Sequence, residues 1–525
     1  MGRGRYSFIW LLASQPWSAA PSSHKACAAS PSGALYYGHY ARSEGVCEWL
    51  GIPYATPPVH ELRFAPPVRP RLKGDFNADN YGFDCPQATS NPPAYPNTTS
   101  QYARVYASFT GALNHTQSED CLTLNVWSSI RSESALKPVF VFIHGGRFAS
   151  GTSNTPFYYG GILSEAQDVV VVTMNFRQNI FGFPGSKETT QNLGFFDQRL
   201  AVEWVHEHIA AFGGDPNRIT LVGQSSGAWA VSNWAYVFQD KPLVAGLISH
   251  SGSIFAFPLT DATVAAANWD MVASKLGCQD AESPLSCMRS DDISLEAILS
   301  AASAVPAPPI STPARSVAPF QATIDDTTGL SVSEYVSRLK AGNFAPIPHL
   351  QIHTDHESGY YRVSSFARLG VALPQSEWDK FELQTFTCAT AAETYHKFKA
   401  GVPVYRARYF SDWDNLRLYE PPSSGPYHGV DINMVIGNSE VVSGVAPSQA
   451  EQKLTELVQG AWAAFAANPS RGAEGLGWPT YQPSEETLVR VGIHTTPEID
   501  FVLPSIYDQA CSESNFSYWD SSIPV

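Results

Sequence analysis

The stretch "ITLVGQSSGAWAV", residues 219–231, places two adjacent serines between two glycines. A catalytic serine is presented by a sharp turn between a strand and a helix, and this turn needs glycine two residues before and two residues after the nucleophile. Gly223 and Gly227 occupy those places for Ser225, whereas Ser226 would have a glutamine and an alanine there. The spacing, which directly follows the apolar run "ITLV", therefore predicts Ser225 as the nucleophile.

A serine hydroxyl attacks an ester only when a base removes its proton and an acid holds that base in place. In hydrolases with this kind of turn, the chain order is serine, acid, histidine. His428, in "SGPYHGVDI", lies in a loop after the apolar run 403–410 and is the candidate base. Asp355 and Glu357, in "HTDHESGYY", are both candidates for the acid, and residue type alone leaves the choice open.

The developing oxyanion of ester cleavage needs hydrogen-bond donors. The stretch "FIHGGRF", residues 142–148, follows an apolar run upstream of the serine, where esterases place such donors. The backbone N–H groups of Gly146, Arg147 and Ser226 are predicted to converge on the oxyanion.

The elements that must position these residues are recognised by runs that are apolar at every position, which indicate parallel strands buried on both faces. These runs are 138–143, 169–174, 219–222, 246–253, 349–358 and 403–410. Helical patterns lie between and after them. One has Asp197 as its expected N-cap and ends at Gly213, and another begins with the capping box Ser448 and Glu451. The order predicts a doubly wound α/β fold, with a large, mostly parallel central sheet covered by helices on both faces.

The composition and net charge of the whole chain restrict the classes of molecule that it is expected to bind. The chain has 525 residues, 44% of them hydrophobic, and a formal net charge of −15. The negative charge opposes binding to nucleic acid or to an anionic membrane, and no apolar run is long enough to be a transmembrane segment. No metal or organic cofactor is implied, because no Cys/His cluster has zinc spacing and no phosphate-binding P-loop is present.

Several features favour the secretory route. Two arginines and a short apolar run within residues 1–20 predict a signal peptide, with residues 21–525 as a single domain. The cysteines number eight, an even count. Acceptor triplets for N-glycans begin at Asn97, Asn114 and Asn515.

Longer stretches resemble the type-B carboxylesterase/lipase family, which includes cholinesterases and fungal lipases. They are "WLGIPYATPPVHELRFAPP", "SEDCLTLNVW", "NFRQNIFGF", "DQRLAVEWVHEHIAAFGGDP" and "HSGS". The resemblance runs from about residue 45 to the end of the chain. It implies an α/β-hydrolase fold and hydrolysis of small-molecule or lipid-like carboxylic esters through an acyl-enzyme.

Carried onto this chain, the resemblance implies the triad Ser225, Glu357 and His428, because "HESGYY" matches the family pattern around the acid. It also implies disulfides between Cys85 and Cys121 and between Cys278 and Cys287, and an ion pair between Arg63 and Glu119. The sequence gives no pairing for the other four cysteines, Cys27, Cys47, Cys388 and Cys511.

Four positions depart from the family pattern: Gln224 replaces Glu, Ser226 replaces Ala, Arg147 replaces Gly, and His356-Glu357-Ser358 replaces Asp-Glu-Gly. Arg147 suggests a preference for acidic esters. The resulting interpretation is a secreted serine carboxylesterase of fungal type, its oligomeric state left open. Two alternatives remain: a biosynthetic esterase or acyl-transfer enzyme with the same site, and a non-catalytic binding protein.

Overall fold

The structure, a computed structural model, describes residues 27–31, 33–42, 45–71, 74–88, 91–130, 135–308 and 311–512. The expected signal peptide, residues 1–20, and the expected glycan acceptor Asn515 lie outside these ranges.

The main sheet has eleven strands within the described residues, in the order β14-β13-β12-β11-β10-β9-β7-β8-β6-β4-β3. The strands from β13 to β8 in this order run parallel to one another, and β14, β6, β4 and β3 pair antiparallel at the two sides. The predicted mostly parallel sheet is therefore confirmed. Its strands are β3 (His39–Tyr40), β4 (Val46–Pro53), β6 (Thr123–Ser129), β7 (Lys137–Ile143), β8 (Val170–Met174), β9 (Gly214–Gln224), β10 (Gly246–His250), β11 (His349–Thr354), β12 (Val404–Tyr409), β13 (Leu488–Val491) and β14 (Ile499–Val502). A small second sheet contains β1 (Ala28–Ala29), β2 (Tyr36–Tyr37) and β5 (Phe76–Asn77).

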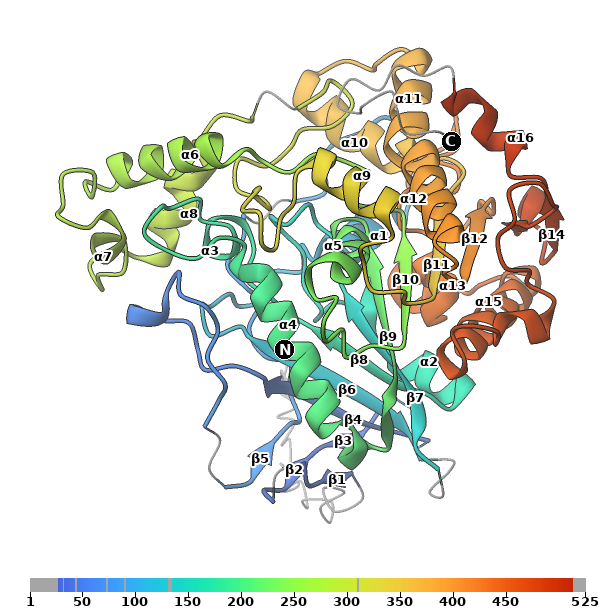
Figure 1. The fold of residues 1–525 in the computed structure, drawn as a ribbon, viewed down its shortest axis with the longest axis horizontal. Helices are drawn as coiled ribbons and strands as arrows, with labels where there is room; N and C mark the ends of the chain where they lie inside the picture. Colours follow the sequence, from blue (N-terminus) through green and yellow to red (C-terminus); the bar gives the residue numbers. More distant parts are fainter. Residues whose placement is uncertain are drawn as a thin grey trace, which may run out of the picture.

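Helices lie on both faces of the main sheet (Figure 1). They are α1 (Tyr102–Thr110), α2 (Gly161–Gln167), α3 (Asn179–Gly182), α4 (Leu193–His208), α5 (Ser226–Val237), α6 (Ala262–Lys275), α7 (Pro284–Met288), α8 (Leu295–Ser303), α9 (Val332–Ala341), α10 (Ser358–Leu369), α11 (Gln375–Glu382), α12 (Cys388–Lys399), α13 (Ile432–Ile436), α14 (Ser439–Ser443), α15 (Gln449–Ala467) and α16 (Ser505–Asp508). None of the helices in the described ranges is both long enough and apolar enough to cross a membrane.

Strand β7 shows why its run is apolar at every position. Val139, Val141 and Ile143 pack into a core that includes side chains of α4 and α5, whereas Phe140 and Phe142 pack into a second core with α2 and α15. Successive side chains of a strand point to opposite faces, so a strand between two helical layers buries all of them.

Helix α4 begins earlier than predicted. It starts at Leu193, after Asn192 in a left-handed conformation with φ of 53°, so the expected N-cap Asp197 lies inside the helix. The carboxylate of Asp197 is fully buried and binds Arg177, with Arg177 Nη2 at 2.7 Å from Oδ1 and Nε at 2.9 Å from Oδ2. This ion pair uses the oxygens that a cap would need. The expected end at Gly213 is present, where φ is 84° after the short 3₁₀ helix Ile209–Phe212. The capping box is present too, because Ser448 Oγ accepts from Glu451 N.

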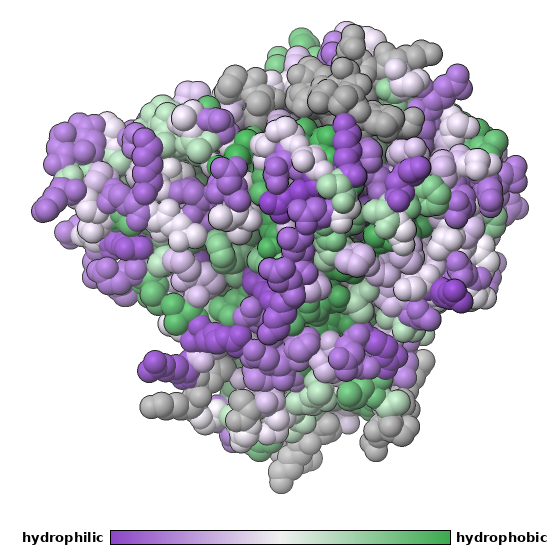
Figure 2. Space-filling view, in the orientation of Figure 1, coloured by the Kyte–Doolittle hydropathy of each residue, from purple (hydrophilic) through white to green (hydrophobic). Residues whose placement is uncertain are grey.

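Four disulfides cross-link the described residues: Cys27–Cys47, Cys85–Cys121, Cys278–Cys287 and Cys388–Cys511. Two of them are the pairs that the resemblance implied, and the other two join the cysteines that the sequence left unpaired. Arg63 also binds Glu119 through two hydrogen bonds of 2.7 and 2.6 Å. Hydrophilic residues cover most of the face in Figure 2, with hydrophobic residues visible between them.

Candidate active site

Ser225 stands between the end of β9 and the start of α5, and its φ is 58° and its ψ −121°. Figure 1 labels the two elements. Few L-residues adopt such a conformation, and its strain of about 1–3 kcal/mol is typical of functional turns. A Cβ added to Gly223 would lie 2.2 Å from Gly227 O, and one added to Gly227 would lie 2.1 Å from Ile143 O. Because both distances are shorter than any real contact, the two glycines are required by close backbone approach.

The candidate base His428 lies in the loop between β12 and α13, and its Nδ1 is 2.5 Å from Glu357 Oε2. Glu357 directly follows β11, is 1% exposed, and accepts a 2.8 Å hydrogen bond from Thr354 N through its other oxygen. Asp355 instead forms an ion pair with Arg408 at 2.8 Å. The structure thus brings Glu357 to the histidine, whereas Asp355 is engaged elsewhere.

The other imidazole nitrogen of His428, Nε2, lies 3.2 Å from the side-chain amide nitrogen of Gln224, the residue before Ser225. Nδ1–H donates to Glu357, and the Gln224 amide donates to Nε2 only when Nε2 carries no proton. The two contacts therefore favour the neutral tautomer with its lone pair on Nε2, which is the form a base requires. His428 and Ser225 line one cavity of about 50 Å³.

Aromatic rings surround the imidazole of His428. The ring centroids of Tyr361 and Phe386 lie 5.0 and 5.3 Å from that of His428, and those of Phe109 and Tyr360 both lie 6.2 Å away. Apolar walls lower the local dielectric, so the contact between His428 and Glu357 is stronger here than it would be in water.

The predicted oxyanion loop follows β7. Gly146, Arg147 and Phe148 have φ values of 118°, 60° and 59°, three successive residues in the region that favours glycine. This turns the backbone toward Ser225, and Gly146 and Arg147 line the same cavity. Within the described residues, no acceptor binds the N–H groups of Gly146, Arg147 or Ser226. They are available to a ligand.

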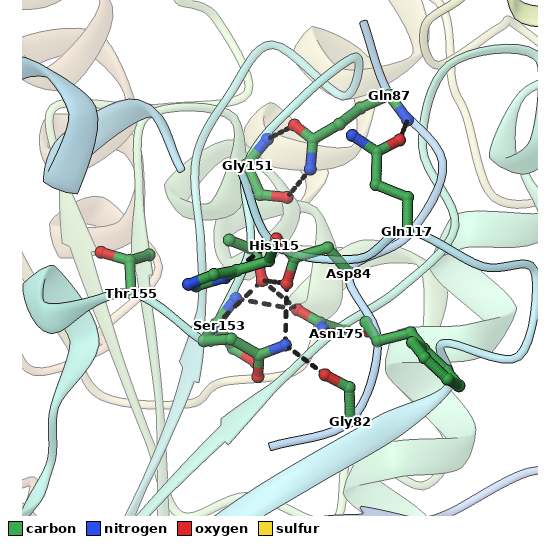
Figure 3. A network of polar contacts seen from close by, with 12 residues as sticks. Gly82, Asp84, Gln87, His115, Gln117, Gly151, Ser153, Thr155 and Asn175 are labelled. Carbon is green, nitrogen blue, oxygen red and sulfur yellow. Dashed lines mark hydrogen bonds and ion pairs between the residues drawn. The ribbon is translucent and has the colours of Figure 1, made fainter. Parts of the chain in front are cut away.

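Contacts that the sequence did not indicate hold this strained loop. Phe148 N donates to Ser226 Oγ at 3.3 Å, and Phe148 O accepts from Asn179 N at 2.7 Å. The prediction gave Ser226 only a backbone role, but its hydroxyl also ties the loop to the elbow. At the far end, Gln87 bonds both Gly151 N and Gly151 O, at 2.7 and 3.1 Å (Figure 3). Gln87 lies 64 residues from Gly151 in sequence, and no local pattern predicts such a contact.

His144 begins the oxyanion loop and is buried with its ring stacked on Phe176, at a centroid distance of 4.5 Å. Burial lowers the pKa of His144 to about 4. The imidazole is therefore neutral near pH 7 and has a structural place under the loop.

Two of the three expected glycan acceptors can be placed. Asn97 and Asn114 are both exposed, and both have positive φ. The side-chain nitrogen of Asn97 donates to Pro421 O at 2.9 Å, whereas Asn114 borders a surface cavity.

A serine in a strand-to-helix elbow, a buried His–Glu pair and free loop amides, all at the carboxyl ends of parallel strands, define the protein as an α/β hydrolase. The model of the carboxylesterase family matches residues 33–370. A chlorogenic acid esterase of Aspergillus niger is 31% identical over 469 residues, which cover 85% of this chain and 86% of that protein. Secreted lipase 5 of Gibberella zeae is 28% identical over 93% of this chain and 94% of its own. The solved structure of a PNB esterase has a TM-score of 0.73 at 25% identity, covering 92% of this chain and 98% of the other. The chain belongs to the carboxylesterase family, and it is a carboxylic ester hydrolase.

Proposed function

We propose that Ser225 is the nucleophile of this esterase, His428 its general base and Glu357 the acid that orients the base. The 2.5 Å contact between His428 Nδ1 and Glu357 Oε2 carries this proposal, because it leaves Nε2 facing the turn that holds Ser225. The shared cavity and the strained backbone of Ser225 support it further.

In the proposed reaction, His428 Nε2 takes the hydroxyl proton as Ser225 Oγ attacks the ester carbonyl carbon. Glu357 stabilises the resulting imidazolium, and the N–H groups of Gly146, Arg147 and Ser226 bind the negative oxygen of the tetrahedral intermediate. His428 then protonates the leaving alcohol, which leaves an acyl group on Ser225. Water attacks this acyl-enzyme by the same route, so the carboxylic acid and the free serine are released.

The test is covalent labelling with a fluorophosphonate, read by mass spectrometry of the peptide that contains residues 219–231. Label on Ser225, and loss of both label and p-nitrophenyl butyrate hydrolysis in Ser225→Ala, is the expected result. Ser251→Ala is the matched control, since Ser251 is a buried serine at the end of the neighbouring strand, with no hydrogen-bond partner for its hydroxyl in the described structure. Persistent hydrolysis in Ser225→Ala would falsify the mechanism.

The substrate class is a separate part of the proposal. Relatives carry the names of a chlorogenic acid esterase and of a lipase, so we propose small-molecule or lipid-like carboxylic esters. A series of p-nitrophenyl esters with increasing acyl length separates the two, because a preference for acetyl or butyryl indicates a carboxylesterase and a preference for long chains a lipase. An added alcohol that diverts the acyl group from water would instead favour the acyl-transfer alternative.

Export from the cell is proposed on three supports: the signal-like residues 1–20, four disulfides, and a relative named as secreted. One main sheet includes strands from His39 to Val502, which supports a single domain over residues 21–525. Expression in a secreting host tests both cleavage near residue 20, by N-terminal sequencing, and glycans at Asn97, Asn114 and Asn515, by mass before and after enzymatic deglycosylation.

A further inference from the structure

A second cavity adjoins the catalytic one. Its volume is about 240 Å³, against about 50 Å³ for the cavity around Ser225. Both are lined by Thr110, Arg147, Ser150 and Tyr360, so they meet at the oxyanion loop. We call the larger one the side cavity. The catalytic cavity has room for the reacting group, and the side cavity has room for a further part of the substrate.

Arg147 carries a charge on the wall between the two cavities. Its Nη1 donates to Ser316 O at 3.0 Å, and it forms no ion pair with any carboxylate of the described residues. Most of its N–H groups are therefore open to a ligand. Burial raises the pKa of Tyr360, a phenol that lines both cavities, and the charge of Arg147 acts against that rise.

His115 is a second basic group on the wall of the side cavity, with a side chain 37% exposed. Its Nδ1 lies 3.3 Å from Asp84 Oδ2, and this hydrogen bond raises the pKa of His115 against the opposing effect of burial.

Asp84 is the one carboxylate among the residues that line the side cavity, and its side chain is almost completely buried. Its side chain is only 3% exposed, and its Oδ1 accepts from Thr152 Oγ1 at 2.6 Å and from Asn154 Nδ2 at 2.8 Å (Figure 3). With Oδ2 facing His115, both oxygens are occupied. The wall thus presents basic groups to the cavity in a protein whose net charge is −15.

We propose that the side cavity binds a carboxylate carried by the ester substrate, held by the Arg147 guanidinium and the His115 imidazole while the ester carbonyl lies at Ser225. This inference rests on the proposed function of Ser225. Arg147 joins the two events physically, because its backbone N–H belongs to the oxyanion loop and the residue lines both cavities. The substrate class is a carboxylic ester with a free acid group on a second part of the molecule.

The carboxylate can lie on either side of the scissile bond, and two matched substrate pairs separate these cases. In 4-acetoxybenzoate and 4-acetoxybenzamide the acid or amide is on the alcohol part. In p-nitrophenyl hydrogen glutarate and its primary amide it is on the acyl part. For each pair, the selectivity ratio is kcat/KM for the acid divided by kcat/KM for the amide.

Arg147→Asn is the main variant, because asparagine tolerates the positive φ at this position. For the pair whose acid reaches the side cavity, we expect a wild-type ratio above one and a fall of roughly tenfold in Arg147→Asn, the effect of losing one charge-assisted hydrogen bond. Arg147→Lys should retain most of the ratio. His115→Gln should lower the ratio a few-fold, and it keeps the glycan triplet at Asn114 intact.

Arg218→Gln is the matched control, since it removes the same charge near the other end of β9 and should leave both ratios unchanged. Ratios of one or less in the wild type, or ratios that Arg147→Asn and His115→Gln both leave unchanged, overturn the inference. An equal loss for acid and amide in Arg147→Asn, with no change of ratio in His115→Gln, also overturns it, because Arg147 would then only fix the loop. Failure of the wild type to hydrolyse any ester tested refutes the proposed function instead.

Discussion

Replacing Ser226 with alanine removes one hydroxyl group from the junction between the elbow and the oxyanion loop. In the structure, this hydroxyl accepts the N–H of Phe148, which has φ of 59° and is 1% exposed. Without it, the buried Phe148 N keeps no acceptor, and the strained loop loses one of the two backbone hydrogen bonds described for this residue.

The expected loss of stability can be worked from the contact. An unsatisfied buried N–H costs about 1–3 kcal/mol, and a bond as long as 3.3 Å places this case near 1–2 kcal/mol. At about 2.1 cal/mol/K per residue, a chain of this length changes its melting temperature by about 1 °C per kcal/mol. Ser226→Ala should therefore melt about 1–2 °C below the wild type.

The expected loss of activity is also limited. Removing an oxyanion donor outright costs about 10²- to 10³-fold in kcat. Ser226→Ala keeps every backbone donor and weakens only one attachment of the loop, so we expect kcat to fall about three- to tenfold with KM nearly unchanged. Ser225→Ala, at the adjacent position, is the matched comparison for Ser226→Ala. It should lose at least 10⁴-fold in kcat with almost no change in melting temperature, because the Ser225 side chain borders the catalytic cavity instead of packing in the core.

The assay is steady-state hydrolysis of p-nitrophenyl butyrate by both variants, with thermal unfolding at one fixed scan rate. If Ser226→Ala equals the wild type in both measurements, the hydroxyl does not position the loop. If Ser226→Ala loses as much activity as Ser225→Ala, the wrong serine has been assigned as the nucleophile.

Three further predictions follow from other contacts. Glu357→Gln should lower kcat about 10⁴-fold through a wrong imidazole tautomer, whereas Asp355→Asn should change it only a few-fold; equal effects in ester hydrolysis would contradict the choice of acid. The pKa of His144 is lowered to about 4 from about 6.5, so the folded state binds fewer protons between these values, and stability is lost as pH falls through this window. Urea unfolding at pH 4.5 and pH 7 should show up to roughly 2 kcal/mol less pH dependence in His144→Gln than in the wild type, and identical dependence would refute this. Replacing both Cys388 and Cys511 with serine opens a loop of 123 residues and should lower the unfolding free energy by about 5 kcal/mol, read as a fall of about 5 °C in melting temperature; a fall below 1 °C would show that this cross-link contributes little.

Much of the fold could be predicted from the sequence, because the patterns that indicate its strands and turns lie within short stretches of the chain. The six runs correspond to β7 to β12, because a strand covered on both faces buries nearly all its side chains and is therefore rich in apolar residues. The glycines around Ser225 could be predicted because a tight turn excludes side chains at fixed offsets. The start of α4 was predicted wrongly, because the carboxylate of Asp197 binds Arg177, twenty residues away, instead of capping the helix.

Other features depend on contacts between distant parts of the chain, and these only the tertiary structure decided. Residue type left Asp355 and Glu357 equivalent, and the sheet distinguishes them because the chain turns Glu357 toward His428 and Asp355 toward Arg408. The pairing of Cys388 with Cys511 likewise joins residues 123 positions apart.

The sequence by itself determined the fold class and the kinds of residue available for chemistry, because periodicity, turn glycines and residue type act over a few positions. The tertiary structure decided which of these residues meet. It gave Ser226 a hydroxyl contact with Phe148, and it placed Arg147 on the wall between two cavities. Such contacts follow from how separate elements pack together, and no short stretch of the chain encodes them.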